Sequence, residues 1–167
     1  MSLSLVIATH NAKKVREIKP LLEPLGIQLL SLDQFGLTQP PDETGETFAA
    51  NAVIKATSAA RATGHWALAD DSGLMVDALN GRPGVHSARY SGVGCTDADN
   101  NAKLLAELQH VPTNQRGAQF VCHLALSDPH GNVPLQVEAY CRGRIIDVHR
   151  GAQGFGYDPL FLVPEYH

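Results

Sequence analysis

The stretch Trp66-Ala-Leu-Ala-Asp-Asp-Ser-Gly-Leu-Met-Val-Asp77 decides the interpretation of the chain, because an apolar run ends there in two adjacent carboxylates. Asp70 and Asp71 are followed by a Ser-Gly pair, after which apolar residues alternate again. This pattern predicts a strand, a polar break and a second strand. Because consecutive strand side chains point to opposite faces, Asp70 and Asp71 cannot both face the core, and one of them can face a cleft.

The two acids have two interpretations on this stretch alone. Carboxylates at a strand end suit a divalent metal ion or a positioned water molecule. Aspartate, serine and glycine are also common turn formers, so an ordinary turn is the alternative.

The surrounding sequence predicts an α/β fold with a mixed sheet. Strands and helices alternate in the first half of the chain, and two long hairpin strands follow in the second half. Strands are expected over residues 3–8, 27–31, 118–126 and 133–148, and helices over 46–62 and over 97–108. A further helix, expected after the segment 9–14, carries Val15, Ile18, Leu21, Leu22 and Leu25. The helix over 46–62 has an alanine-rich apolar stripe, and Lys55 lies at its edge. Lys55 is therefore expected either to reach a specific partner or to extend into solvent along the stripe.

The segment Thr9-His-Asn-Ala-Lys-Lys14 directly follows the first strand and opens a helix. Free backbone N–H groups at a helix N-terminus attract anions, so the segment is typical of a phosphate-binding loop. It is not a Walker A loop, because the glycines of GxxxxGK[ST] are absent. An Asn or Thr N-cap with solvated lysines is the structural alternative.

A second glycine-rich segment, Gly154-Phe-Gly-Tyr-Asp-Pro159, places two aromatic residues between glycines and an acid. A planar ring could stack on Phe155 or Tyr157, and Asp158 could accept hydrogen bonds from a base or a ribose. The alternative is a tight glycine turn that leads into a strand over residues 160–163.

Composition limits the classes of function. The 167 residues are 44% hydrophobic and carry a net charge of -4, which fits one globular domain. No Lys/Arg cluster is present, so neither a nucleic-acid polymer nor an anionic membrane is an expected partner. The N-terminal apolar run is too short for a signal peptide or a membrane span, and a cytoplasmic location is expected. Three cysteines without metal-site spacing are expected to be reduced.

Six motifs in order resemble the inosine/xanthosine triphosphate pyrophosphatases, a family that removes deaminated purine nucleotides from the nucleotide pool. They are Ala8–Lys14, Glu43–Phe48, Asn51–Ala56, Ala69–Leu74, Pro83–Tyr90 and Gly154–Pro159. The resemblance implies a single domain over residues 1–167, with an elongated mixed β-sheet, flanking helices and two lobes around a nucleotide cleft. It also implies a homodimer and the Mg²⁺-dependent hydrolysis of inosine, deoxyinosine and xanthosine triphosphates to the monophosphate and pyrophosphate.

The resemblance also implies roles for individual residues. Asp71 would be the base for the attacking water, and Glu43 and Asp71 would coordinate Mg²⁺. The substrate would be bound by the first loop and by residues of later motifs: Thr9, His10, Asn11, Ala12, Lys13, Lys14, Lys55, Ser72, Phe155, Gly156, Tyr157 and Asp158. Among these, Phe155 would stack on the purine.

The chain departs from the family pattern in two respects. His10 and Lys13 stand where the family often has glycine, although Asn11 and Lys14 keep their register. The family also has a Ser-His-Arg motif and a terminal helix after the glycine-rich loop, so a truncated chain or a lost part of the base pocket is expected. A pyrophosphatase for another modified nucleotide and a non-catalytic nucleotide-binding protein are the alternative functions.

Overall fold

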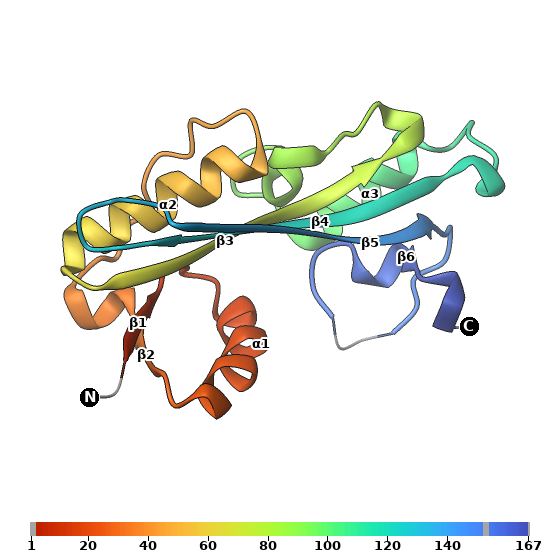
Figure 1. The fold of residues 1–167 in the computed structure, drawn as a ribbon. Coiled ribbons are helices and arrows are strands. Elements are labelled where there is room, and N and C mark those ends of the chain that lie inside the picture. The colour runs from red at the N-terminus through yellow and green to blue at the C-terminus, as the bar shows by residue number, and fades with distance from the viewer. Residues whose placement is uncertain (1–2, 152–153, 167) are drawn as a thin grey trace. The chain divides into compact units, whose positions relative to one another are not determined.

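A computed structural model describes residues 3–151 and 154–166. Over these residues the strands form one six-stranded sheet in the order β2-β1-β3-β4-β5-β6 (Figure 1). β1 runs parallel to both β2 and β3, whereas β5 and β6 are antiparallel, so the sheet is mixed. The strands are β1 Ser4–Ile7, β2 Gln28–Ser31, β3 Trp66–Val76, β4 Gly117–Ser127, β5 Leu135–Ile145 and β6 Phe161–Leu162.

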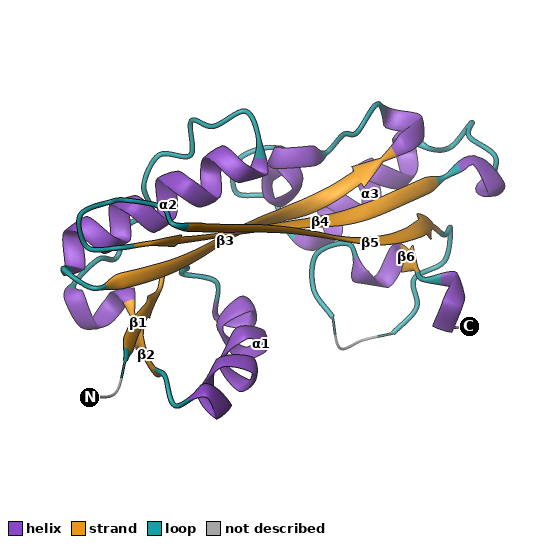
Figure 2. Ribbon diagram, viewed as in Figure 1, coloured by secondary structure: helices purple, strands orange, loops and turns teal. Residues whose placement is uncertain are grey.

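Three α-helices accompany the strands in the described part of the chain: α1 Ala12–Leu22, α2 Phe48–Thr63 and α3 Asp97–Glu107 (Figure 2). The predicted α/β fold with a mixed sheet and flanking helices is confirmed. The chain divides into two compact units: the first comprises Met1–Asp71 and His123–Glu138, and the second comprises Ser72–Cys122 and Ala139–His167. The elongated form and the cleft between lobes stay predictions.

The core of the first unit is built mainly from alanines. Ala52, Ala56 and Ala60 on α2 are fully buried and belong to one cluster with Ala67 of β3 and Ala125 of β4. Because these side chains are small, the helix can lie close to the sheet and bring its polar side chains within reach of β3.

The ends of α2 follow from local sequence. Thr47 caps the N-terminus by accepting a hydrogen bond from the backbone of Ala50 at 3.1 Å. Gly64 ends the helix with a left-handed φ of 69°, a conformation that glycine adopts without steric cost. The helix therefore starts two residues later and ends one residue later than the sequence predicted.

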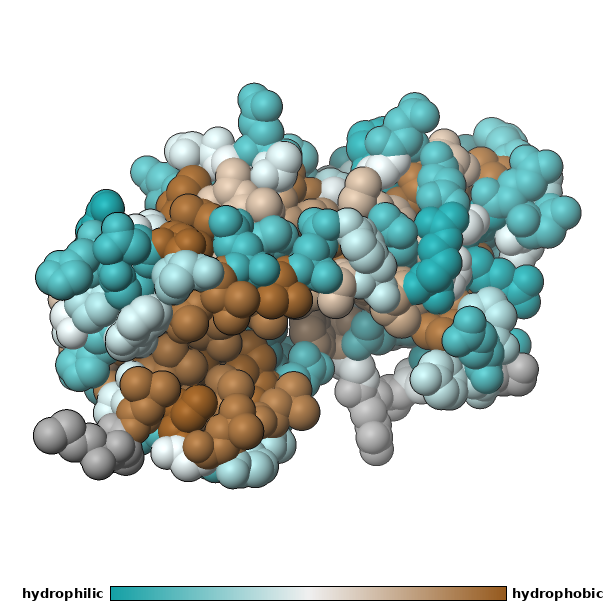
Figure 3. Space-filling view, viewed as in Figure 1, coloured by the Kyte–Doolittle hydropathy of each residue, from teal (hydrophilic) through white to brown (hydrophobic). Residues whose placement is uncertain are grey.

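The opposite face of the first unit carries α1, which has no buried residue. Leu21 and Leu25, within and just after this helix, remain exposed, as does Leu3 before β1. Figure 3 shows the apolar surface that these segments contribute on one side of the molecule.

The second unit has its own core. Leu74 and Val76 of β3, Leu104 of α3 and Leu160 are fully buried in one cluster. α3 begins with a capping box, in which Thr96 and Asp99 bond each other's backbone N–H groups. No helix in the described ranges has the length and apolar character needed to cross a bilayer.

The predicted polar break in the central stretch is wrong, because β3 continues from Trp66 through Val76. Asp70 and Asp71 lie inside the strand and are only 6% and 8% exposed. Lysines from two different helices reach these carboxylates, so the acids can stay in the sheet instead of leaving it for water. Sequence alone could not place those lysines.

Candidate functional site

The first loop is positioned by the parallel pairing of β1 with β3. The backbone N–H of Ala8 donates to Leu68 O at 2.8 Å, so the chain leaves β1 directly beside Asp70. Asn11 then caps α1: its Oδ1 accepts hydrogen bonds from the backbone N–H groups of Lys13 and Lys14, at 2.9 and 3.4 Å. The predicted Asn11 N-cap is thus confirmed, whereas the solvated lysines that accompanied it are wrong for Lys14, which pairs with Asp70. Binding of phosphate by the loop stays a prediction.

Two further contacts fix the shape of this loop. Thr9 Oγ1 accepts a hydrogen bond from the backbone of Asn11 at 3.1 Å. The His10 ring nitrogen Nε2 lies 2.9 Å from Leu37 O, so the imidazole ties the loop to the segment after β2. The loop is preorganised by its own polar side chains.

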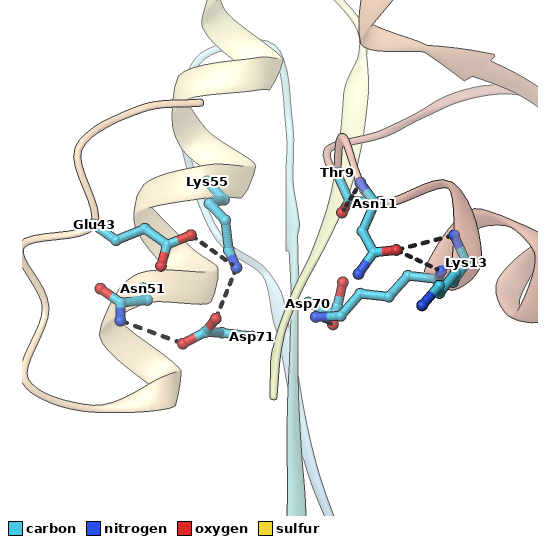
Figure 4. A network of polar contacts seen from close by, with 9 residues as sticks. Thr9, Asn11, Lys13, Glu43, Asn51, Lys55, Asp70 and Asp71 are labelled. Atoms are coloured by element: carbon cyan, nitrogen blue, oxygen red, sulfur yellow. Dashed lines mark hydrogen bonds and ion pairs between the residues drawn. The ribbon is translucent and has the colours of Figure 1, made fainter. Parts of the chain in front are cut away.

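Asp70 and Asp71 point to opposite faces of β3, as the pleat requires (Figure 4). On the face toward α1, Lys14 Nζ donates to Asp70 Oδ2. On the face toward α2, Lys55 Nζ donates to Asp71 Oδ1 at 2.8 Å. Two neighbouring residues of one strand therefore anchor a charged cluster on each face of the first unit.

The cluster toward α2 gathers the two predicted metal ligands around one cation. Lys55 Nζ lies 3.4 Å from Glu43 Oε1 and 2.8 Å from Asp71 Oδ1. The Lys55 side chain is only 12% exposed, so the ion pairs are largely shielded from water. Lys55 thus reaches specific partners, as one of its two predicted interpretations required.

Burial has a measurable electrostatic consequence at Asp71. Removal of the carboxylate from water raises the pKa of Asp71 above its usual range. The hydrogen bond and charge of Lys55 act in the opposite direction, and the nearby charge of Glu43 raises the pKa further. Asp71 is therefore a stronger base than a solvated aspartate.

The arrangement fits a divalent cation whose remaining coordination positions are filled by a ligand and water. The carboxylates of Glu43 and Asp71 already converge on one positive charge. Mg²⁺ commonly uses one or two carboxylates together with substrate phosphates and water. Among the residues that the structure describes, no group of three or more His, Cys, Asp or Glu side chains could hold a metal. Glu43 and Asp71 are thus the residues of this cluster that could hold a metal ion.

Asn51 was not predicted as a site residue, although it links the parts of this cluster. Its Nδ2 donates to Asp71 Oδ2 at 3.3 Å, and its Oδ1 accepts from the backbone of Gly45 at 2.8 Å. A Cβ on Gly45 would lie 2.6 Å from Asn51 Oδ1, so only glycine fits there. Asn51 and Lys55 are four residues apart on α2, a spacing that could have indicated their shared partner.

We expect Asn51→Ala to lower the free energy of unfolding by about 1–3 kcal/mol, because Asn51 is 1% exposed and two hydrogen bonds are lost. The loop that carries Glu43 should loosen as well. Urea unfolding at neutral pH measures the change, with the exposed Asn114→Ala as a control that should stay within about 0.5 kcal/mol of wild type. Equal stability of the two variants would contradict the bridging role.

The second unit holds the remaining predicted site residues. Ser72 lies within β3, immediately after Asp71. Phe155 is partly exposed, and its backbone N–H donates to Asp158 Oδ2 at 2.9 Å. Tyr157 is buried, and its hydroxyl donates to Ser87 O at 2.8 Å. Asp158 therefore shapes its own loop, while its predicted contact with a base or ribose stays a prediction.

The structure thus brings the predicted residues together in three groups. Thr9, Asn11 and Lys13 form the capped loop in the first unit. Glu43, Lys55 and Asp71 form the ion-pair cluster in the same unit. The remaining group is the loop of the second unit, which contains Phe155, Gly156, Tyr157 and Asp158.

Known proteins share this fold and sequence. The dITP/XTP pyrophosphatase of Rhodopirellula baltica is 54% identical over 163 residues, covering 98% of this chain and 78% of that protein. The protein of the same name from Geobacillus kaustophilus is 53% identical, over 96% of this chain and 78% of its own length. Each is similar along nearly all of the present chain.

Solved structures agree with these sequence relatives. The structure of a HAM1 protein from Coxiella burnetii matches with a TM-score of 0.87 and 42% identity, over 98% of this chain and 83% of that one. A nucleoside-triphosphatase / dITP/XTP pyrophosphatase from Mycobacterium abscessus matches with a TM-score of 0.81 and 43% identity, over 97% and 82% of the two chains. The Ham1 family model matches residues 5–167. The resemblance predicted from the six motifs is confirmed, and the chain belongs to the Ham1 family.

Proposed function

We propose that the chain hydrolyses inosine, deoxyinosine and xanthosine triphosphates to the monophosphate and pyrophosphate, with Mg²⁺, and so removes deaminated purines from the nucleotide pool. The observation that carries the proposal is the Glu43–Lys55–Asp71 cluster. It lies in the same unit as a helix-capping loop, and the chain is a member of the Ham1 family.

The enzyme class is supported more directly than the substrate. Relatives about 50% identical over nearly the whole chain are named dITP/XTP pyrophosphatases. The prediction of a nucleoside-triphosphate pyrophosphohydrolase is therefore confirmed at the level of the class. Inosine triphosphate as a substrate and Mg²⁺ as the metal belong to the proposal.

The first loop would bind the triphosphate. Asn11 fixes the shape of the loop at the start of α1, where a helix N-terminus favours anions, and Lys14 adds a positive charge there. Thr9 would hold the loop in this shape and present its hydroxyl to a phosphate oxygen. His10, Ala12 and Lys13 would contribute mainly through the backbone of the loop.

Glu43 and Asp71 would hold Mg²⁺, which when bound neutralises phosphate charge and polarises water. The Asp71 carboxylate would accept the proton of the attacking water, which would lie beside the bound metal ion. Lys55 would move from the carboxylates toward the phosphates and stabilise the negative charge that develops on them. Ser72, next to Asp71, would contact the substrate.

Base selection would depend on the loop around Phe155, whose ring would stack on the purine. Gly156, Tyr157 and Asp158 would line the base and sugar. Hypoxanthine and xanthine carry a 6-oxo group and an N1–H, whereas adenine carries a 6-amino group. A hydrogen-bond donor opposite position 6 would leave the adenine amine without an acceptor, at a cost of about 1–3 kcal/mol.

The test is pyrophosphate release from a panel of triphosphates, with and without Mg²⁺. We expect release from inosine, deoxyinosine and xanthosine triphosphates at least about tenfold faster than from adenosine triphosphate, since one unpaired buried group costs that much. Guanine shares the 6-oxo group, so slower release from guanosine triphosphate would depend on an unpaired 2-amino group. Removal of Mg²⁺ with a chelator should abolish release from every substrate. Equal rates across the panel would contradict the proposed selectivity.

The alternative of a non-catalytic nucleotide-binding protein predicts a different result. It requires nucleotide affinity by calorimetry together with no pyrophosphate release from any triphosphate. A preference for a modified pyrimidine would instead favour the second alternative. The proposal also includes a homodimer, which rests on the family resemblance and is tested by light scattering of the purified protein.

A further inference from the structure

The loop that carries Phe155 is held by two side chains of α3. The backbone N–H of Gly156 donates to Asp97 Oδ2 at 2.9 Å. Asn101 Nδ2 donates to the backbone oxygen of the same glycine, also at 2.9 Å. Asp97 and Asn101 are four residues apart on the helix, so they lie on one face, and together they hydrogen-bond both the N–H and the oxygen of Gly156.

The residues on either side of Gly156 are also held by hydrogen bonds. Gly156 has a φ of 57°, a left-handed conformation that most residues adopt only with strain. The N–H of Phe155 donates to Asp158, and the hydroxyl of Tyr157 donates to Ser87 O. Burial raises the pKa of Tyr157, so this hydroxyl stays protonated and remains a donor.

The contact from Asn101 belongs to the packed part of the second unit. Asn101 is only 3% exposed, and the neighbouring Leu104 is fully buried. The contact from Asp97 is exposed and holds the other polar group of Gly156. Loss of Asn101 would remove the protein partner of the Gly156 oxygen, and loss of Asp97 would leave the Gly156 N–H to bond water, so either change would allow Phe155 to reorient.

We propose that Asp97 and Asn101 are positioning residues of the base-binding loop, which hold Gly156 so that the Phe155 ring is preorganised to stack on a planar base. The inference rests on the proposed function, because it assigns Phe155 to the purine. Preorganisation improves affinity by reducing the ordering cost that binding would otherwise incur. Both side chains contact Gly156 and would act through the loop.

The test compares Asp97→Ala and Asn101→Asp with two matched variants. Asp97→Asn keeps a side-chain oxygen that can accept from Gly156, and it should restore wild-type behaviour. Asp99→Ala removes an acid from the same helix end and weakens the cap, but Asp99 bonds Thr96 and not the loop. Asn101→Asp replaces the donor with a carboxylate that repels the oxygen of Gly156.

We expect Asp97→Ala and Asn101→Asp to raise the KM for inosine triphosphate about tenfold, because one of the two hydrogen bonds that hold Gly156 is lost in each. The kcat should stay within about twofold, since Asp71 and Lys55 are unchanged. Inorganic tripolyphosphate, used as a competitive inhibitor, has no base to stack. Its inhibition constant should not change in either variant.

A second readout needs no turnover. Amide hydrogen exchange of Phe155 and Gly156 should accelerate in Asp97→Ala and not in Asp97→Asn, and a non-hydrolysable imido analogue of inosine triphosphate should bind about tenfold more weakly. If the wild-type protein released no pyrophosphate, the proposed function would fail, while exchange and analogue binding would still decide the positioning role. Unchanged exchange and affinity in Asp97→Ala would overturn the inference. The inference would also be overturned if Asp97→Ala weakened binding of the analogue and of tripolyphosphate equally, or if Asp99→Ala lost as much affinity for the analogue as Asp97→Ala.

Discussion

Replacement of Asp71 by asparagine should lower kcat for pyrophosphate release by about 10²–10⁴-fold, the usual contribution of a general base. Asparagine has nearly the same shape and cannot accept the proton of the attacking water. It also removes one of the two carboxylates that converge on Lys55, so half-maximal activity should require a higher Mg²⁺ concentration. Steady-state release from inosine triphosphate at several Mg²⁺ concentrations measures both effects.

The fold of the Asp71→Asn variant should survive. Ionised Asp71 is disfavoured by burial, so a neutral side chain removes a desolvation cost. The amide nevertheless faces two donors, Lys55 and Asn51, and can accept from only one of them with its oxygen. The free energy of unfolding should therefore change by less than about 2 kcal/mol.

The control for this variant is Asp77→Asn, the same substitution at an exposed aspartate that pairs with Arg142. It should retain wild-type turnover, because an exposed ion pair contributes little. Full turnover by Asp71→Asn would rule out Asp71 as the base. A stable variant that binds nucleotide but does not turn over would support the assignment.

Replacement of Lys14 by alanine should raise the KM for inosine triphosphate by about ten- to a hundredfold, because a charge-assisted contact to phosphate is worth about 1.5–3 kcal/mol. Lys14 also forms the ion pair with Asp70, which is 6% exposed. The single variant should therefore lose stability as well, by up to about 3 kcal/mol. Turnover kinetics and urea unfolding separate the two losses.

A double variant isolates the role of Lys14 in binding. Lys14→Ala with Asp70→Asn removes the charge that Lys14 balances, so it should regain much of the stability and none of the affinity. Lys19→Ala is the matched control, since Lys19 is exposed on the same helix and pairs only weakly with Glu23. A wild-type KM in Lys14→Ala would contradict the proposed phosphate-binding loop.

Local rules predicted much of this site from the sequence. The strand pleat alone required Asp70 and Asp71 to face opposite ways, and the structure shows them doing so. The position of Lys55 at the edge of the alanine stripe indicated a partner, which is the Glu43–Asp71 pair. The Asn11 N-cap depends on local chemistry alone, and it was one of the two interpretations that the sequence predicted for the first loop.

Contacts between distant residues could not be predicted in the same way. The Ser-Gly pair after Asp71 suggested a break, and only the lysines at positions 14 and 55 explain why the strand continues. Asn51 was not predicted as a site residue because its two partners, Gly45 and Asp71, belong to separate elements. Its bridging role depends on how closely α2 packs on the sheet, which the alanines permit but do not specify.

The central claim is that this chain cleaves a nucleoside triphosphate to a monophosphate and pyrophosphate. Phosphorus NMR of the products formed from inosine triphosphate and Mg²⁺ tests it most directly. We predict inosine monophosphate and pyrophosphate in equal amounts, with no diphosphate. Inosine diphosphate with orthophosphate, or unchanged substrate alongside measurable nucleotide binding, would contradict the account.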